Sequence, residues 1–257
     1  MRKSIWLVCL LSFKLFYGQK VEILNKSGFQ HNYAVKSFEY IEDANDTSKL
    51  NYMATLKMTG KADYYTGNVV RWVVKIRATA KKIGANAFCL QEYRERDSIG
   101  TLVINVYFAG DYFLKANKLK ANKSNIYLFG TSTHPQDSAD FYLNGSKKVF
   151  SSTKNYLINT SLNIDYNIAV TENKLTNLPV KYKSEEKSRY FIIPKSKAPT
   201  ASFKPMKNPA NKGSAGFAAA AIFGPVGVAA YSMASYGPNR VIEIPYNYGR
   251  LMSDVFK

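Results

Sequence analysis

Few residues of this chain have the type and spacing that catalysis or metal binding requires. The two histidines, His31 and His134, stand about a hundred positions apart, and neither belongs to a run with metal-ligand spacing. No glycines of a nucleophile elbow flank Ser138 or Cys89. The glycine-rich stretch 213–216 lacks the lysine of a phosphate-binding loop. The sequence therefore predicts no catalytic residue, no metal ligand and no cofactor, and it favours a protein that is not an enzyme.

The charge of the chain is strongly positive. Its 257 residues include 36 Lys and Arg against 18 Asp and Glu, a formal net charge of +18. Such a field attracts anionic lipid, lipopolysaccharide, nucleic acid or another acidic polymer. Aromatic residues make up 14% of the chain, and an abundance of Tyr and Phe favours strands over helices.

The first eighteen residues predict a secretory signal peptide. A basic start, 1–4, precedes the apolar run 5–13, and Gly18 offers a small residue for cleavage. The apolar run is too short for a bilayer, which takes about 20 helical residues. The small residue followed by Gln19 is similar to signals of Bacteroidota-type bacteria. We therefore expect export to the periplasm or outer membrane, where nucleic acid is not an expected partner.

Residues 19–113 are expected to form an α+β unit with one helix packed on an antiparallel sheet. After a polar lead-in at 19–32, alternation over 50–58 predicts a half-buried strand. Two further β-rich runs follow at 87–93 and 101–108. Between the strand at 50–58 and these two runs lies an apolar stripe at helical spacing, which ends before Gly84 and consists of Val69, Val73, Ile76, Ala80 and Ile83.

The same helix is expected to carry cations on its other face. Arg71, Lys75 and Lys82 fall on one side of it, away from the apolar stripe. One interpretation makes this face a surface for acidic partners. The other makes it an ordinary solvated face, and both stay open at the level of sequence.

Residues 125–194 are expected to form a small β-sandwich-like domain. Short β-rich runs recur every 8–12 residues with turn signals between them. The dipeptide Asn144-Gly145 separates two such runs, and both residues accept the positive φ that a tight hairpin requires.

Two partial resemblances support a location in the bacterial envelope. The turn at 80–87, where a helix runs straight into an apolar strand, resembles an element of small exported proteins such as the stress-sensing lipoprotein of the Rcs system. The pieces 142–145, 148–149 and 166–170 resemble β-sandwich modules named for a Pro-Glu-Gly-Ala motif, although the usual Pro-Gly pair is absent. These resemblances imply a binding or scaffolding role. They carry over no site, because Cys89 alone cannot form the sensor's disulfides.

A basic linker is expected at 114–124. Its sequence is a five-residue duplication, 114–118 and 119–123, with four lysines and no acid. A solvated linker or short exposed helix is one interpretation, and a patch for a membrane surface or polyanion is the other. The patch would consist of Lys115, Lys118, Lys120 and Lys123.

Two unusual segments precede the end of the chain. Residues 195–212 form a basic, proline-rich tether that cannot be a continuous helix, and its lysines include Lys204, Lys207 and Lys212. Residues 213–239 form an uncharged Gly/Ala-rich segment, expected as a helix or helical hairpin. Its predicted contact residues are Gly216, Ala220, Gly224, Pro225 and Gly227. A C-terminal strand and tail at 240–257 complete the chain.

Three arrangements of 213–239 remain open: it spans a membrane, it lies on a membrane or partner, or it packs on the protein as a hairpin. Low hydrophobicity and the Gly-Pro break count against spanning. The leading hypothesis is a non-catalytic envelope protein that associates with a membrane or protein partner through 195–239. The alternatives are a soluble periplasmic module that binds an acidic ligand or polymer, and a secreted effector that inserts into membranes.

Overall fold

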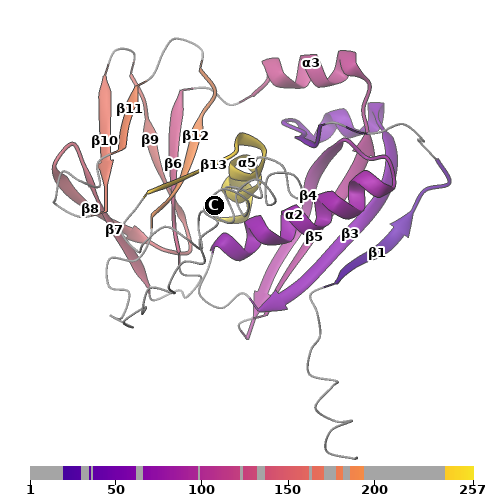
Figure 1. Ribbon diagram of the computed structural model, residues 1–257, viewed down its shortest axis with the longest axis horizontal. Coiled ribbons are helices and arrows are strands. Elements are labelled where there is room, and N and C mark those ends of the chain that lie inside the picture. The colour runs from indigo at the N-terminus through magenta and orange to yellow at the C-terminus, as the bar shows by residue number, and fades with distance from the viewer. Residues whose placement is uncertain are drawn as a thin grey trace, which may run out of the picture.

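The computed structural model describes most of the body of the chain. The described residues are 20–29, 35, 37–61, 66–97, 99–121, 124–131, 137–161, 164–170, 178–181, 186–193 and 241–257. The predicted signal peptide, the tether and the Gly/Ala-rich segment lie outside them. The described chain is mixed α+β, mostly sheet, with three separate sheets, so the α+β class is confirmed (Figure 1).

The first sheet has five strands in the order β1-β3-β5-β4-β2. Neighbours pair antiparallel except β2, which runs parallel to β4 at one edge. The prediction of a polar lead-in was wrong in part, because β1 forms there and pairs with β3. The strands are β1 (Val21–Lys26), β2 (Glu39–Tyr40), β3 (Asn51–Lys61), β4 (Ala87–Arg96) and β5 (Ile99–Phe108).

Helix α2 (Thr66–Lys82) covers one face of this sheet, as the apolar stripe predicted. Its Trp72, Val73 and Ile76 are at most 1% exposed, and they pack against inward residues of the strands. Leu56 and Met58 of β3 alternate with outward residues and lie in the same cluster. Burial of this stripe, rather than intrinsic propensity, supplies most of the stability of such a helix.

The opposite face of the first sheet is covered over only part of its length. A 3-10 helix, η2 (Ala44–Lys49), and α3 (Asp111–Leu119) enclose a small cluster there. This cluster includes Ile41, Tyr107 and Leu114. The predicted linker is therefore helical over most of its length and has one buried side.

The second half of the chain forms two four-stranded sheets, ordered β11-β10-β7-β8 and β13-β12-β6-β9. The predicted hairpin turn is confirmed: Asn144 and Gly145 have φ of 51° and 81° between β7 and β8. The strands are β6 (Asn125–Gly130), β7 (Ser138–Leu143), β8 (Ser146–Ser151), β9 (Asn155–Asn159), β10 (Asp165–Ala169), β11 (Leu178–Lys181), β12 (Arg189–Ile193) and β13 (Ile242–Ile244).

The sheet that contains β12 is buried on both faces. Phe191 and Ile193 pack into a cluster with strands of the neighbouring sheet. Tyr190 and Ile192 point the other way, into the cluster that also holds Trp72 of α2. Two-sided burial explains why β12 reads as a continuous apolar run instead of alternating.

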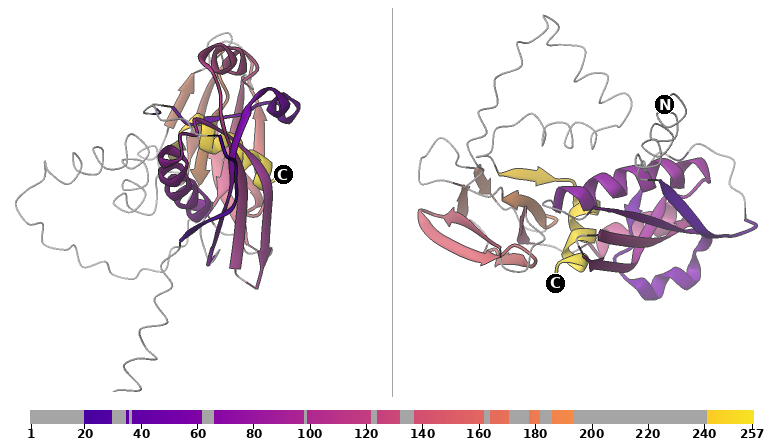
Figure 2. Two further views of the ribbon diagram at one scale, coloured as in Figure 1. Left: turned by 90° about the vertical axis from the view of Figure 1, so that its right-hand side faces the viewer. Right: turned by 90° about the horizontal axis from the view of Figure 1, so that it is seen from below.

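Helix α5 (Tyr246–Val255) joins the two halves of the molecule, where the sequence predicted only a strand and tail. It lies between the first sheet and β12 (Figures 1 and 2). Its Leu251 and Met252 are fully buried in the cluster that both halves share. Gly249 permits this approach, because a Cβ there would lie 2.1 Å from Cγ of Tyr190.

Candidate functional site

The structure describes three of the predicted contact residues. Lys115 lies on α3 with Lys118, and Lys120 follows its last turn. The remaining predicted residues lie outside the described part of the chain, so their prediction is untested. They are Lys123, Lys204, Lys207, Lys212, Gly216, Ala220, Gly224, Pro225 and Gly227.

Two of these three lysines face carboxylates across the fold. Lys118 Nζ lies 3.6 Å from Glu39 Oε1, and Lys120 forms an ion pair with the buried Asp46. The hydrogen bond from Lys120 holds the pKa of Asp46 below its ordinary value. Tertiary neighbours therefore neutralise much of the charge that the duplication gives to this segment.

A buried amide ties α3 to the edge strand β2. Asn117 Oδ1 accepts a hydrogen bond from the Glu42 N–H at 2.9 Å, and its Nδ2 donates to the Tyr40 carbonyl at 2.7 Å. These contacts satisfy two backbone groups at the end of β2 that would otherwise lack partners. The segment is thus fixed to the first sheet.

The two ends of the undescribed segment 194–240 meet at one place on the body. Strand β12 ends at Ile193, and β13 runs antiparallel beside it, with Ile192 opposite Ile242 and Tyr190 opposite Ile244. The chain therefore leaves the second half of the molecule and returns beside its point of departure. The segment that holds the predicted contact residues is an inserted loop instead of a free tail.

A depression of about 570 Å³ lies beside this strand pair. Arg189 makes a two-point ion pair with Glu243 across the strands, at 2.7 and 2.8 Å. Lys187 Nζ lies 4.7 Å from the centre of the Tyr246 ring. A bidentate pair of this kind fixes the register of the strands that carry the two ends of the loop.

The contact between α5 and β2 contains a dense polar network. Arg250 lies between two carboxylates, 3.1 Å from Glu42 Oε2 and 2.8 Å from Asp254 Oδ2. The Tyr40 hydroxyl donates to Asp254 at 2.5 Å, and the Tyr246 hydroxyl donates to Glu42 at 2.8 Å. Each charged group therefore has partners within the protein.

Burial and hydrogen bonding act in opposite directions on the pKa values of the two carboxyl groups in this network. Burial raises the pKa of Glu42, in spite of the opposing contacts with Tyr246 and Arg250. Burial also acts to raise the pKa of Asp254, but hydrogen bonds from Lys257, Tyr40 and Arg250 outweigh it and hold that pKa below its ordinary value. Removing one partner would weaken the docking of α5, because it would leave a buried charge uncompensated.

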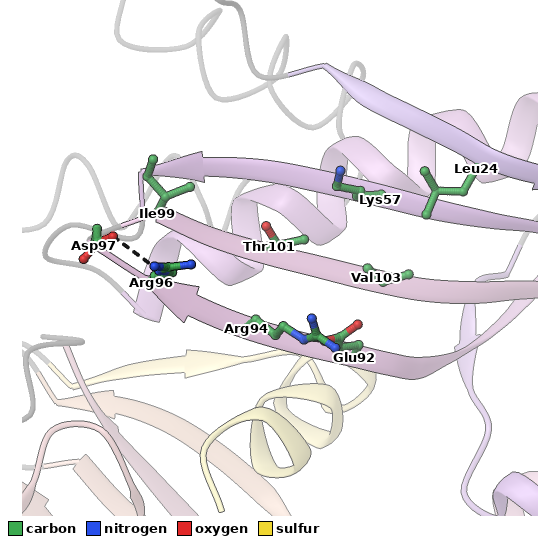
Figure 3. Close-up of a pocket in the computed structure, with 9 residues that line it drawn as sticks. All are labelled: Leu24, Lys57, Glu92, Arg94, Arg96, Asp97, Ile99, Thr101 and Val103. Atoms are coloured by element: carbon green, nitrogen blue, oxygen red, sulfur yellow. Dashed lines mark ion pairs between the residues drawn. The ribbon is translucent and has the colours of Figure 1, made fainter.

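The exposed part of the first sheet forms a shallow groove of about 660 Å³, shown in Figure 3. Lys57, Thr101 and Val103 alternate with residues that face α2, so the groove lies on the face away from that helix. Arg94 and Arg96 line it from β4, and Leu24 closes it from β1 (Figure 3).

The charges of the groove are paired. Lys57 lies 3.4 Å from Glu22, Arg96 lies 3.5 Å from Asp97, and Arg94 contacts Glu92. Four of these six side chains are more than half exposed, and exposed pairs exchange partners at little cost. The Thr101 hydroxyl can hydrogen-bond a group bound in the groove, but the paired charges give no strong preference for anions.

Metal binding or nucleophilic catalysis at other positions has little support among the described residues. They contain no group of three or more His, Cys, Asp or Glu placed to hold a metal. The Cys89 thiol is buried, and burial raises its pKa, which lowers its reactivity as a nucleophile. None of the described helices combines the length and the apolar character needed to cross a membrane.

Comparisons with known proteins assign no family to the chain. The chain matches no protein-family model, no curated protein and no solved structure.

Proposed function

We propose that this is an exported, non-catalytic envelope protein that associates with a membrane surface or an envelope protein through residues 195–239. The body would be an α+β module and a β-sandwich-like module joined by α5, and it would hold the Gly/Ala-rich segment 213–239 against its target. The pairing of β12 with β13 carries this proposal, because it fixes both ends of the loop at one place.

The strand pairing restricts how the loop can meet a membrane. A chain that leaves and returns on one side of a bilayer crosses it an even number of times. Two helical crossings need about 40 residues, more than 213–239 contains, so a spanning helix is disfavoured. Contact at the surface, or a shallow hairpin, fits the fixed ends.

The tether supplies an electrostatic term on the N-terminal side of the Gly/Ala-rich segment. Each Lys close to an anionic surface contributes about 1 kcal/mol, and the tether includes Lys204, Lys207 and Lys212. Salt screens this electrostatic attraction beyond about a Debye length, whereas it does not weaken apolar contact.

The test is fractionation of cells that make the full chain, followed by high-salt and carbonate washes. We expect the protein in the membrane fraction, with partial release by salt and full release by carbonate. A variant with Lys204→Gln, Lys207→Gln and Lys212→Gln should be released at lower salt. A protein that stays wholly soluble at low salt would exclude the proposal.

The alternative is a soluble periplasmic module that binds an acidic ligand or polymer, with the groove of Figure 3 as its site. Lys57, Arg94 and Arg96 would exchange their carboxylate partners for the ligand. In that case high salt abolishes ligand capture, and the protein remains soluble throughout.

A further inference from the structure

Helix α3 exposes two apolar side chains that the fold does not bury. Tyr112 is 89% exposed and Leu119 is 78% exposed, more than any other large apolar side chain in the described part of the chain. Seven positions separate them, which is about two helical turns, so both lie on one side of α3 about 10 Å apart along its axis. Packing of the core therefore does not account for either residue.

The same side of α3 carries a lysine. Lys115 follows Tyr112 by three positions and precedes Leu119 by four, so its side chain emerges between theirs. Lys115 is exposed, and no carboxylate among the described residues forms an ion pair with it. The one acid of α3 is Asp111, in the first turn, where a negative charge stabilises the helix dipole. An aromatic ring, an aliphatic chain and a cation thus share one exposed side.

The opposite side of α3 holds the helix in place. Leu114 and Asn117 are buried, and the Asn117 amide hydrogen-bonds two backbone groups at the end of β2. The exposed side is therefore preformed on a fixed helix. A partner that contacts it does not have to order the chain first, which lowers the entropic cost of binding.

The size and shape of this side favour a lipid surface over a protein partner. A stable protein interface buries about 800 Å² on each partner. A nine-residue helix, about 14 Å long and about 10 Å wide, presents a footprint of roughly 140 Å². Neither of the two depressions described above includes a residue of α3. Helix α3 lies at the upper end of the molecule in Figure 1 and in the left view of Figure 2, where a flat bilayer can reach it.

A second copy of the chain fits this side less well. Two copies of α3 that packed antiparallel through Tyr112 and Leu119 would bring their Lys115 side chains together at the two-fold axis. Like charges in such positions repel each other. The phosphates of a lipid surface instead complement this lysine.

We propose that the exposed side of α3 is a contact site for the headgroup region of a lipid bilayer. The Tyr112 ring lies at the level of the headgroups, where amphipathic aromatic rings are favoured. Leu119 enters the boundary of the acyl chains, and Lys115 extends its ammonium group to the lipid phosphates. The inference rests on the proposed function for access to a membrane, but it places the contact on the body, apart from residues 195–239.

The first experiment reports contact at α3 itself. The chain has two tryptophans, Trp6 in the predicted signal peptide and Trp72, which is buried. In the full chain with Trp6→Phe, the replacement Tyr112→Trp introduces one exposed fluorophore on α3. With vesicles of phosphatidylcholine and phosphatidylglycerol at low salt, we expect its emission to shift to shorter wavelength and to be quenched by lipid with brominated acyl chains. The matched replacement Val149→Trp, at an exposed position of β8, should show neither change.

The second experiment measures what the apolar side chains contribute to binding. Tyr112→Ser together with Leu119→Ser should weaken binding to the same vesicles about thirtyfold, because two apolar side chains no longer leave water. Thermal melts should be nearly unchanged, since both positions are exposed. Val149→Ser together with Leu157→Ser removes two exposed apolar side chains from the second half of the molecule and should leave binding unchanged.

The third experiment measures the contribution of the cation. Lys115→Gln should weaken binding to the anionic vesicles about fivefold, which corresponds to one Lys near an anionic surface. Arg96→Gln is the matched control, since Arg96 is 93% exposed and lies at the turn between β4 and β5, at the other end of β5 from α3. Equal losses in the two variants would show that net charge alone accounts for the effect, and would overturn the role of Lys115.

The outcomes separate this inference from the proposed function. Binding to vesicles without a fluorescence change in Tyr112→Trp would overturn the inference and leave the contact through 195–239 standing. A fluorescence change, with binding unaltered when Lys204, Lys207 and Lys212 are replaced by Gln, would support the inference and count against the tether as a contact.

Two further outcomes would assign the exposed side of α3 to a different partner and overturn the inference. Binding to cell membranes but not to lipid vesicles would indicate a membrane protein. A fluorescence shift of Tyr112→Trp that grows with protein concentration in the absence of lipid would indicate a second copy of the chain.

Discussion

Helices α2 and α3 both pack one face on the first sheet and carry lysines on the other. On α3, Lys118 faces Glu39, and beyond its last turn Lys120 faces Asp46. On α2, Arg71 and Lys82 have no carboxylate partner among the described residues. A cation therefore forms an intramolecular ion pair beside α3, whereas two cations of α2 have no carboxylate partner among the described residues.

The difference arises from what lies beside each helix. Helix α3 covers the part of the sheet next to η2 and β2, where Asp43, Asp46 and Glu39 gather. Helix α2 covers the opposite face, and its flank meets Tyr248 of α5, a neutral side chain. The number of charged residues can be read from the sequence, but only the fold determines which of them form ion pairs.

The largest expected contrast is in how much apolar side-chain surface each helix buries. Replacement Ile76→Ala on α2 should lower the free energy of unfolding by about 3 kcal/mol, because it leaves a cavity in the shared core. Leu119→Ala at the end of α3 should change it by less than about 0.5 kcal/mol, because Leu119 is 78% exposed. Urea unfolding of both variants tests this contrast, and equal losses would show that α3 is as integral as α2.

The second contrast is in how the stability of the protein changes at acidic pH. The pKa of Asp46 lies below its ordinary value of 3.8 because of its hydrogen bond with Lys120, so its folded form binds protons less readily than its unfolded form. Its contribution to stability is therefore complete above pH 3.8 and is lost as pH falls through the lower folded pKa.

Urea midpoints measured across this acidic range should fall less steeply for Asp46→Asn than for the unchanged protein. Asp165→Asn is the matched control, since Asp165 and its partner Lys181 are both exposed. If Asp46→Asn leaves the slope unaltered, Lys120 does not hold that carboxylate in solution, and the contrast between the helices weakens.

The smallest expected contrast is in the sign of the change in the free energy of unfolding. Lys81→Gln on α2 should raise the free energy of unfolding by about 0.3 kcal/mol, because it removes a like-charge neighbour of Arg77 four residues away. Lys118→Gln on α3 should lower it by about 0.3 kcal/mol, because it removes the pair with Glu39. Thermal melts at low salt measure both changes, and a shared sign would contradict the contrast between the two helices.

Local patterns were sufficient for several elements of the fold. The apolar stripe from Val69 to Ile83 predicted α2, and Asn144-Gly145 predicted the β7–β8 hairpin. Such signals work because helical spacing and positive φ are properties of adjacent residues. Strand β1 was missed, because it lies at an edge, where mostly exposed residues leave no alternation to detect.

Helix α5 was missed for a different reason. Tyr248, Leu251, Met252 and Phe256 recur at helical spacing, but Gly249 stands among them and weakens the pattern. The glycine is explained only by the close approach of Tyr190 from a strand far away in the chain. The sequence pattern of α5 could therefore be interpreted only with Tyr190, the neighbour of Gly249 in the tertiary structure.

The sequence by itself determined the α+β class, the main helix, the hairpin and the excess of positive charge, because each depends on composition or on neighbouring residues. Only the tertiary structure decided that β12 and β13 bring the ends of 194–240 together. It alone also decided that Lys118 and Lys120 pair with acids, whereas Arg71 and Lys82 have no acidic partner in the part of the chain that the structure describes. Ion pairs and strand partners depend on distances between residues far apart in the chain, and those distances exist only after folding.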